Sequence, residues 1–194
     1  MTNDVDLYIN FVLHAIYGLT PEADSIVRMD PKGIARVAGE LARRHPFEPV
    51  PLYRGVLLAQ PEMLPDDRLT WLSWSEDRDV ARWFGDPASY ISGPFHEYAP
   101  EARGYVVTLV EPPRVLWHHS WRHAFGPPLE YLALRHPSMG IPGGQQIRWS
   151  LDTQREVITE PLLTFPTPEP IEAMPGASIA ELDRRLTPNW IQLP

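Results

Sequence analysis

The sequence favours an α+β fold, in which helices flank a strand-rich middle. Of the 194 residues, 43% are apolar and 22% are charged, so the chain can bury a core and is not globally disordered. Proline accounts for 23 residues, about 12% of the chain against a usual share of about 5%. Because proline is excluded from helix interiors, this content rules out an all-helical bundle and favours short strands joined by rigid loops.

Charge and cysteine content exclude several classes of protein. The chain has 17 Lys+Arg and 25 Asp+Glu, a net charge of −8, which argues against nonspecific nucleic-acid affinity. The absence of cysteine excludes a disulfide scaffold, a thiolate metal site and a cysteine nucleophile. The uncharged run over residues 7–21 is too short to span a bilayer and lacks the basic leader of a signal peptide. We therefore expect a soluble, cytoplasmic protein with no membrane partner.

Two amphipathic helices are predicted near the N-terminus. Apolar residues recur at helical spacing over residues 8–19. The second helix has stronger signals, since Asp30 can cap it, Pro31 sits in its first turn and Pro46 ends it. Both helices are interpreted as scaffold.

Strands and one helix are predicted in the middle of the chain. Residues 50–58 (VPLYRGVLL) are rich in strand formers, and residues 69–85 indicate a short strand, a Ser-Trp-Ser turn and a helix. Residues 104–110 (GYVVTLV) predict a buried strand, and residues 154–159 (QREVIT) predict the last strand. These segments supply the strands of the expected α+β fold.

Two long segments are predicted as loops. Residues 86–103 are rich in Gly, Pro and aromatic residues, and residues 136–153 contain three glycines that could act as hinges. Loops of this length inside a compact domain are usually functional or disordered. Five prolines over residues 161–175 then predict an extended connector before a final capped helix. The sequence thus divides into a domain over residues 1–165 and a packed accessory segment over residues 166–194.

Arg54 lies in the middle of a predicted strand, among apolar residues. A buried guanidinium needs an anionic partner, because an unpaired buried charge is costly. One interpretation is a salt bridge in the core. The other is an arginine held for a phosphate or pyrophosphate, which its forked geometry suits.

Two polar pairs also occur at strand spacing. Ser73 and Ser75 flank Trp74 just before a helix, where Ser75 by itself would be interpreted as a helix cap. Gln154 and Glu156 are one residue apart in a predicted strand, so we expect both side chains on the same face. Taken alone, that pair is typical of a solvated strand face.

Three histidines, His118, His119 and His123, are spaced as metal ligands sometimes are. They have no acidic or thiolate partner nearby in the sequence, so no metal site is predicted. The glycines of the second long loop lack the Lys-Ser/Thr ending of a phosphate-binding loop. Neither pattern is assigned a function.

Taken in order, the polar motifs resemble the Arg-Ser-Glu class of mono-ADP-ribosyltransferases, which is related to cholera and C3-like toxins and to enzymes of some bacteriophages. An aromatic-Arg-Gly strand is followed by Ser-x-Ser, a Val-Ala-x-x-Phe helix and a Gln-x-Glu strand. Each motif is short, and their order provides the specificity. The resemblance covers about residues 47–165. It implies an ADP-ribosyltransferase-like fold, with two packed mixed β-sheets around an NAD cleft and helices outside.

The resemblance assigns four residues to NAD binding. Arg54 matches the arginine that grips the NAD phosphates, and Gly55 matches the residue whose backbone holds the nicotinamide amide. Ser73 matches the serine whose hydroxyl positions the catalytic glutamate, and Ser75 closes that motif. Trp74 departs from the class, since a small residue is usual between the serines.

The resemblance assigns the catalytic role to Glu156 and target selection to Gln154. The loop over residues 140–153 would correspond to the target-recognition loop. Gln154 replaces the glutamate of arginine-modifying members, which implies an Asn/Gln-type side chain or a nucleobase as acceptor.

The resemblance therefore implies an enzyme that transfers ADP-ribose from NAD to a macromolecular acceptor, protein or nucleic acid, and releases nicotinamide. NAD would be the cosubstrate, with no metal, and the protein would be a toxin-like or phage-borne effector. Two alternatives remain open: an NAD glycohydrolase, in which water is the acceptor, and a catalytically inactive binding protein of the same fold.

Overall fold

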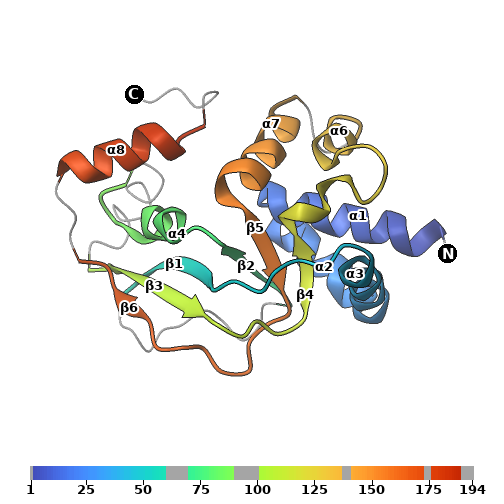
Figure 1. Cartoon of the computed structure of the whole chain (residues 1–194), viewed down its shortest axis with the longest axis horizontal. Helices are drawn as coiled ribbons and strands as arrows, with labels where there is room; N and C mark the ends of the chain where they lie inside the picture. The colour runs from blue at the N-terminus through green and yellow to red at the C-terminus, as the bar shows by residue number, and fades with distance from the viewer. Residues whose placement is uncertain (1, 60–69, 90–100, 137–140, 173–175, 189–194) are drawn as a thin grey trace. The chain divides into compact units, whose positions relative to one another are not determined.

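The computed structural model (Figure 1) describes residues 2–59, 70–89, 101–136, 141–172 and 176–188. The chain divides into two units that interleave along the sequence. The first unit comprises Met1–Pro49, Arg68–Ser73 and Pro112–Pro161. The second comprises Val50–Asp67, Trp74–Glu111 and Leu162–Pro194. Each unit contains helices and antiparallel strands, so the chain is α+β, as the sequence predicts.

Three consecutive helices open the first unit: α1 (Thr2–Tyr17), α2 (Thr20–Met29) and α3 (Pro31–Arg44). The predicted cap of α3 is confirmed, because the Asp30 carboxylate accepts a hydrogen bond of 2.9 Å from the Gly33 N–H. Helix α2 was not predicted. Its buried side consists only of Ala23, Ile26 and Val27, which is a weak periodic signal in a ten-residue helix.

The strands of the first unit pack against these helices. Strands β4 (Val115–His118) and β5 (Glu156–Thr159) pair antiparallel, and β5 is followed in the sheet by β2 (Leu72–Ser75), which is divided between the units after Ser73. The hydroxyl of Tyr8 on α1 donates a hydrogen bond to the carbonyl of Leu116 on β4. Tyr8 is fully buried, and this burial raises the pKa of its hydroxyl well above the ordinary value.

Short helical segments complete the first unit: the 3₁₀ helix η1 (His119–His123), α6 (Leu129–Leu134), α7 (Ile141–Trp149) and the π-helix η2 (Ser150–Gln154). The prediction of a loop over residues 136–153 is therefore wrong for residues 141–153, which are helical; residues 137–140 lie outside the described part of the chain. Gly144 lies inside α7, and a Cβ there would stand 2.7 Å from Leu134 Cδ2 of α6. The glycine lets α6 and α7 pack closely, so it acts as a helix contact and not as a hinge.

The second unit is built on the strand order β2-β1-β3-β6, with β1 (Leu52–Leu58), β3 (Arg103–Leu109) and β6 (Glu169–Pro170). The pairings β1–β2, β1–β3 and β3–β6 are antiparallel, as is β4–β5 in the first unit. Two packed mixed sheets were expected; the described strands instead form one six-stranded sheet in the order β4-β5-β2-β1-β3-β6, and these four pairings are antiparallel. Helix α4 (Arg78–Gly85) packs on β1 and β3.

The C-terminal helix α8 (Gly176–Leu186) belongs to the second unit. The Trp83 indole N–H on α4 donates a hydrogen bond of 2.7 Å to Asp183, and Arg185 lies 3.0 Å from Asp79. The segment after residue 165 thus packs on α4, and it also supplies β6. The two units do not follow the predicted division at residue 165. None of the described helices combines the length and apolar character needed to cross a bilayer.

A histidine pair in the first unit predicts a loss of stability in acid. The rings of His14 and His136 meet edge to face at 5.1 Å, and His136 Nε2 bonds to Asn10 Oδ1 at 3.1 Å. Burial and the neighbouring His14 lower the pKa of His136. The unfolded chain, with an ordinary histidine pKa of about 6.5, therefore binds a proton that the folded state resists.

We expect the free energy of unfolding to be unaffected by His136 above about pH 6.5, the ordinary histidine pKa of the unfolded chain. Below that pH the free energy of unfolding should fall, because the unfolded chain binds the proton more readily. Thermal unfolding at pH 7.5 and pH 5 measures this, and His136→Gln should reduce the difference between the two melting temperatures. His123→Gln, at an exposed position in the same unit, is the control. An equal pH dependence in the unmutated protein and His136→Gln would contradict the expectation.

Candidate active site

The first unit brings together two of the predicted site residues. The Ser73 hydroxyl on β2 donates a hydrogen bond to Glu156 Oε1 on β5, with an O–O distance of 2.5 Å. Glu156 is 3% exposed. A carboxylate that is removed from water needs such donors, and hydrogen bonds to a charged acceptor are short and strong. The pair is therefore a built feature of the fold, formed between residues 83 positions apart.

Strand β5 holds Glu156 on a rigid element. His118 pairs with Val157 and Trp117 pairs with Ile158, directly after Glu156 along β5. Trp117 and Ile158 are fully buried in the core of the first unit. A side chain at the start of such a strand has little freedom to shift, which suits a group that must keep a fixed orientation.

The structure places Gln154 differently from the prediction. Gln154 ends the π-helix η2 and β5 begins only at Glu156, so the two side chains do not project from one strand face. Arg155 between them has a left-handed backbone, with φ 48° and ψ 55°, and its N–H donates to the Ser150 carbonyl. The β-forming residues after position 155 predicted the strand, but the preceding helix runs on to Gln154. The prediction of a shared strand face is therefore wrong.

Arg54 and Gly55 lie on β1 of the second unit, between β2 and β3. Arg54 is half-buried, and its Nε atom is inaccessible to solvent. A Cβ at Gly55 would stand 1.8 Å from the Ala81 carbonyl oxygen and 2.6 Å from the Gly85 nitrogen. Gly55 is therefore required where α4 lies against β1. Since successive side chains alternate along a strand, Arg54 lies on the opposite face of β1 from α4.

Ser75 also belongs to the second unit and is 3% exposed. It pairs with Tyr53 across β1 and β2, so its side chain lies on the same sheet face as Tyr53 and on the opposite face from Arg54. Its hydroxyl accepts a hydrogen bond of 2.9 Å from the Asp77 N–H. Asp77, in turn, caps α4 by accepting from the Asp79 N–H at 2.8 Å. Ser75 shapes the turn before α4, and Asp77 is the cap.

Trp74, the unusual residue between the two serines, is a core residue that is 1% exposed. Its neighbours in the sequence, Ser73 and Ser75, point away from its side of the strand. The large side chain therefore takes a place in the protein interior instead of standing beside the Ser73–Glu156 hydrogen bond.

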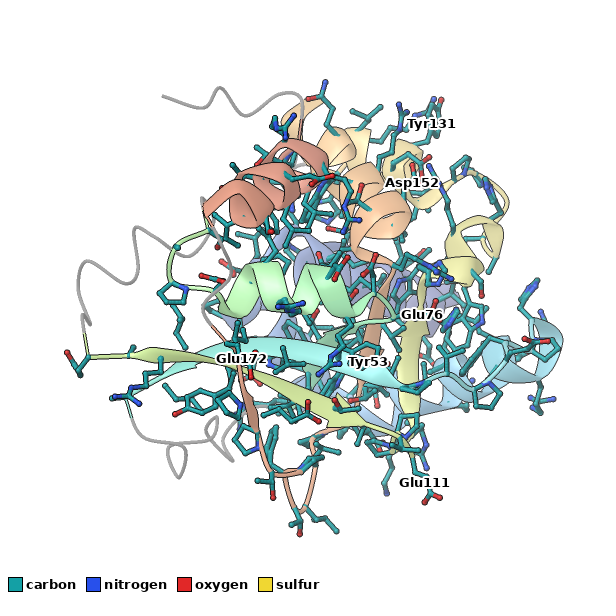
Figure 2. All side chains as sticks on the ribbon, turned by 60° about the vertical axis from the view of Figure 1, so that its left-hand side comes forward. Tyr53, Glu76, Glu111, Tyr131, Asp152 and Glu172 are labelled. Carbon is teal, nitrogen blue, oxygen red and sulfur yellow. The ribbon has the colours of Figure 1, made fainter. Side chains whose placement is uncertain are left out.

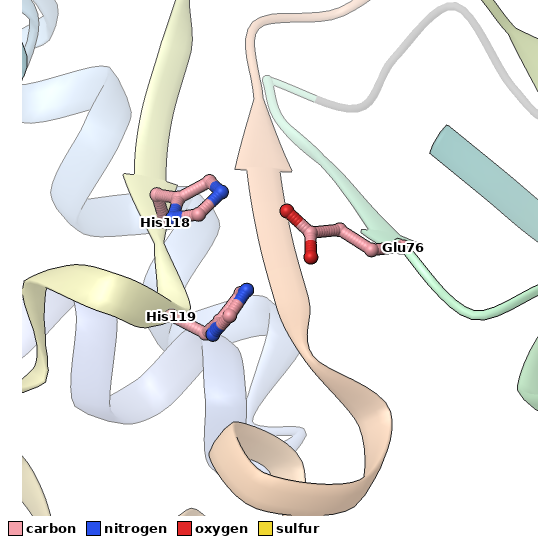
Figure 3. Close-up of side chains that lie close together, drawn as sticks. All are labelled: Glu76, His118 and His119. Atoms are coloured by element: carbon pink, nitrogen blue, oxygen red, sulfur yellow. The ribbon is translucent and has the colours of Figure 1, made fainter. Parts of the chain in front are cut away.

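His118 and His119, both drawn in Figure 3, belong to the first unit and form a stack with Phe47. The Phe47 and His118 rings stack at 4.3 Å and 13°, and the His118 and His119 rings at 4.5 Å and 29°. His118 Nδ1 also lies 2.7 Å from the Ser120 hydroxyl. Glu76, the third side chain drawn there, belongs to the second unit, and no metal centre is assigned to these residues.

A charged cluster in the first unit escaped sequence analysis; we call it the Arg122 anchor, and it consists of Arg122, Glu130 and Asp152. Arg122 Nε lies 3.0 Å and 2.9 Å from the two Glu130 oxygens, and Nη1 lies 2.5 Å from Asp152 Oδ1. Glu130 is 8% exposed. Burial raises its pKa, but hydrogen bonds from Arg122 and its own backbone outweigh that effect, so its pKa is lowered. No periodic signal links residues so far apart in sequence.

No protein-family model, curated protein or solved structure matches the chain.

Proposed function

We propose that the protein is an NAD-dependent mono-ADP-ribosyltransferase with a fold of the ADP-ribosyltransferase type. The observation that carries the proposal is the hydrogen bond from Ser73 to the buried carboxylate of Glu156. In the Arg-Ser-Glu class, which the ordered motifs resemble, the first serine of Ser-x-Ser orients the catalytic glutamate. The same two residue types meet here in the same chain order.

The chemistry of NAD cleavage explains why such a carboxylate would be needed. Breaking the bond between nicotinamide and ribose develops positive charge on the ribose ring, as in glycoside hydrolysis. A fixed carboxylate that binds the ribose 2′-hydroxyl stabilises this charge as it forms. Nicotinamide is a good leaving group, so no general acid is required. In this proposal Glu156 is the electrostatic stabiliser, and Ser73 keeps its carboxylate in one orientation.

In the proposal, Arg54 binds the NAD pyrophosphate. A guanidinium can make two parallel hydrogen bonds to phosphate oxygens, which fixes the donor as well as neutralising it. Support for this role comes from the Tyr53-Arg54-Gly55 motif alone, since Arg54 lies on the face of β1 opposite to that of Ser75. The proposed NAD-binding role of Gly55 uses only its backbone, which agrees with a position that tolerates no side chain.

The experiment that tests the function measures nicotinamide release from NAD by the purified protein, with and without cell lysate. Labelled ADP-ribose in protein or nucleic acid when lysate is present supports a transferase, with or without slower hydrolysis of NAD by the purified protein alone. Release without lysate and without labelled macromolecules indicates a glycohydrolase. No release under either condition overturns the enzymatic proposal and indicates a binding protein.

We expect that the acceptor is not a guanidinium group. Gln154 offers an amide, with one acceptor and two donors and no charge, which suits a carboxamide side chain or the edge of a nucleobase. Agmatine and free arginine should therefore remain unlabelled, and Gln154→Glu should reduce transfer to lysate acceptors while NAD hydrolysis persists. Gln145→Glu, at an exposed position on α7, is the matched control. Efficient labelling of agmatine by the unmutated protein would overturn this expectation.

A further inference from the structure

The Arg122 anchor connects three segments of the first unit. Arg122 comes from η1, Glu130 from α6 and Asp152 from η2. The side chains of Arg122 and Glu130 are 21% and 11% exposed, whereas that of Asp152 is 53% exposed. Hydrogen bonds to Glu130, together with the charges of Glu130 and Asp152, raise the pKa of Arg122 despite its partial burial. Arg122 and Glu130 are thus the partly buried, fixed pair of the anchor, and Asp152 is the exposed residue attached to that pair.

The segment attached through Asp152, labelled in Figure 2, has an unusual conformation. Residues 150–154 are π-helical, and Arg155 has the left-handed backbone that non-glycine residues seldom adopt. The Ser150 hydroxyl is buried without a hydrogen-bond partner among the described residues. Each of these features costs free energy, so contacts elsewhere must hold the segment in place. The contact from Arg122 to Asp152 is directed at the middle of this segment.

We infer that Arg122 is a positioning residue. Through its contact with Asp152 it holds the η2 segment, and it thereby fixes the position of Gln154, which ends that segment. The inference rests on the proposed function, in which Gln154 selects the acceptor and Glu156 cleaves NAD. Water needs no recognition segment, whereas a macromolecular acceptor does. Loss of the anchor therefore reduces transfer to the acceptor more than it reduces hydrolysis of NAD.

The test uses Asp152→Asn, which removes the charge of the exposed residue of the anchor and so weakens its contact with Arg122, and leaves the partly buried Arg122–Glu130 pair intact. The matched control is Asp79→Asn in the second unit, because the Asp79 side chain is 47% exposed and also pairs with one arginine, at 3.0 Å. Asp152→Glu keeps the charge and should restore the behaviour of the unmutated protein. Circular dichroism establishes that each variant is folded.

Two measurements then decide the inference. Hydrogen exchange of residues 150–155 should become faster in Asp152→Asn and stay unchanged in Asp79→Asn. With labelled NAD and cell lysate, the ratio of label in macromolecules to free ADP-ribose should fall about 10-fold to 100-fold, as expected when a reacting group is displaced by about 1 Å. Total NAD consumption should stay near that of the unmutated protein.

Unchanged exchange of residues 150–155 in Asp152→Asn would overturn the inference, because the contact would not hold the segment. An equal loss of hydrolysis and transfer would also overturn it, since Arg122 would then only support the fold. If the unmutated protein consumes no NAD, the proposed function fails and the role in transfer fails with it. The exchange measurement still decides, in that case, whether Arg122 holds η2.

Discussion

Glu156→Gln is expected to abolish most NAD cleavage in a protein that remains folded. The amide keeps the size of the side chain and an oxygen that can accept from Ser73, but it loses the charge that stabilises the transition state. Removing one electrostatic stabiliser of this kind costs about 2.7–4 kcal/mol, or roughly 10²-fold to 10³-fold in rate. Nicotinamide release by the purified variant, with melting temperature as the check of folding, measures the effect.

The matched control for this prediction is Glu160→Gln, which makes the same change four residues along the chain. Glu160 forms an ion pair of 2.9 Å with Arg114, and both side chains are substantially exposed. Exposed pairs contribute little, so this variant should keep full activity and stability. Near-normal NAD cleavage by folded Glu156→Gln would remove Glu156 from the chemistry and with it the proposed function.

Gly55→Ala is expected to cause the largest loss of stability among single-methyl substitutions in the second unit. The added Cβ would stand 1.8 Å from a backbone oxygen of α4, and backbone atoms cannot move aside by changing rotamer. Helix α4 must shift as a whole, which should cost about 3 kcal/mol or more. For a chain of this size, that corresponds to a fall in melting temperature of roughly 6–12 °C.

Gly39→Ala provides the contrast for Gly55→Ala. Gly39 lies inside α3, and a Cβ there would have no neighbour within 4 Å. Alanine is favoured over glycine in a helix interior by roughly 0.5–1 kcal/mol, so Gly39→Ala should raise the melting temperature slightly. If Gly55→Ala melts at the temperature of the unmutated protein, α4 does not lie against β1 as the structure has it.

Local signals were sufficient for some elements of the fold. Helix α3 was predicted because its cap and first turn are encoded by adjacent residues, Asp30 and Pro31. Helix α2 was missed because its buried side consists only of Ala23, Ile26 and Val27, and its contact with Thr70, whose hydroxyl donates a hydrogen bond of 2.6 Å to the Asp24 carboxylate, leaves no local pattern. Helix α7 was missed because Gly144 was taken as a hinge, whereas its small size serves packing against Leu134.

The candidate site was predictable only in part. Neither composition nor periodicity connects Ser73 with Glu156; the resemblance of the ordered motifs did so. The resemblance could not show that Gln154 ends a helix, because π-helical geometry and a left-handed Arg155 depend on how the segment is held. Arg122, which we infer holds this segment through Asp152, is 30 residues from Asp152, and the contact has no sequence signature.

The interleaved units also have a consequence for protein synthesis. Helices α1–α3 leave the ribosome before the strands, yet Phe11 of α1 packs against Trp71, and Tyr8 bonds to Leu116 on β4. The core of the first unit cannot close until β5, near residue 159, has emerged. Strands β1 and β3 of the second unit are synthesised in the meantime, between the segments of the first unit. Nascent chains that stop short of β5 therefore present the apolar residues of α1, α2 and α3 without the strands that cover them, to chaperones or to one another.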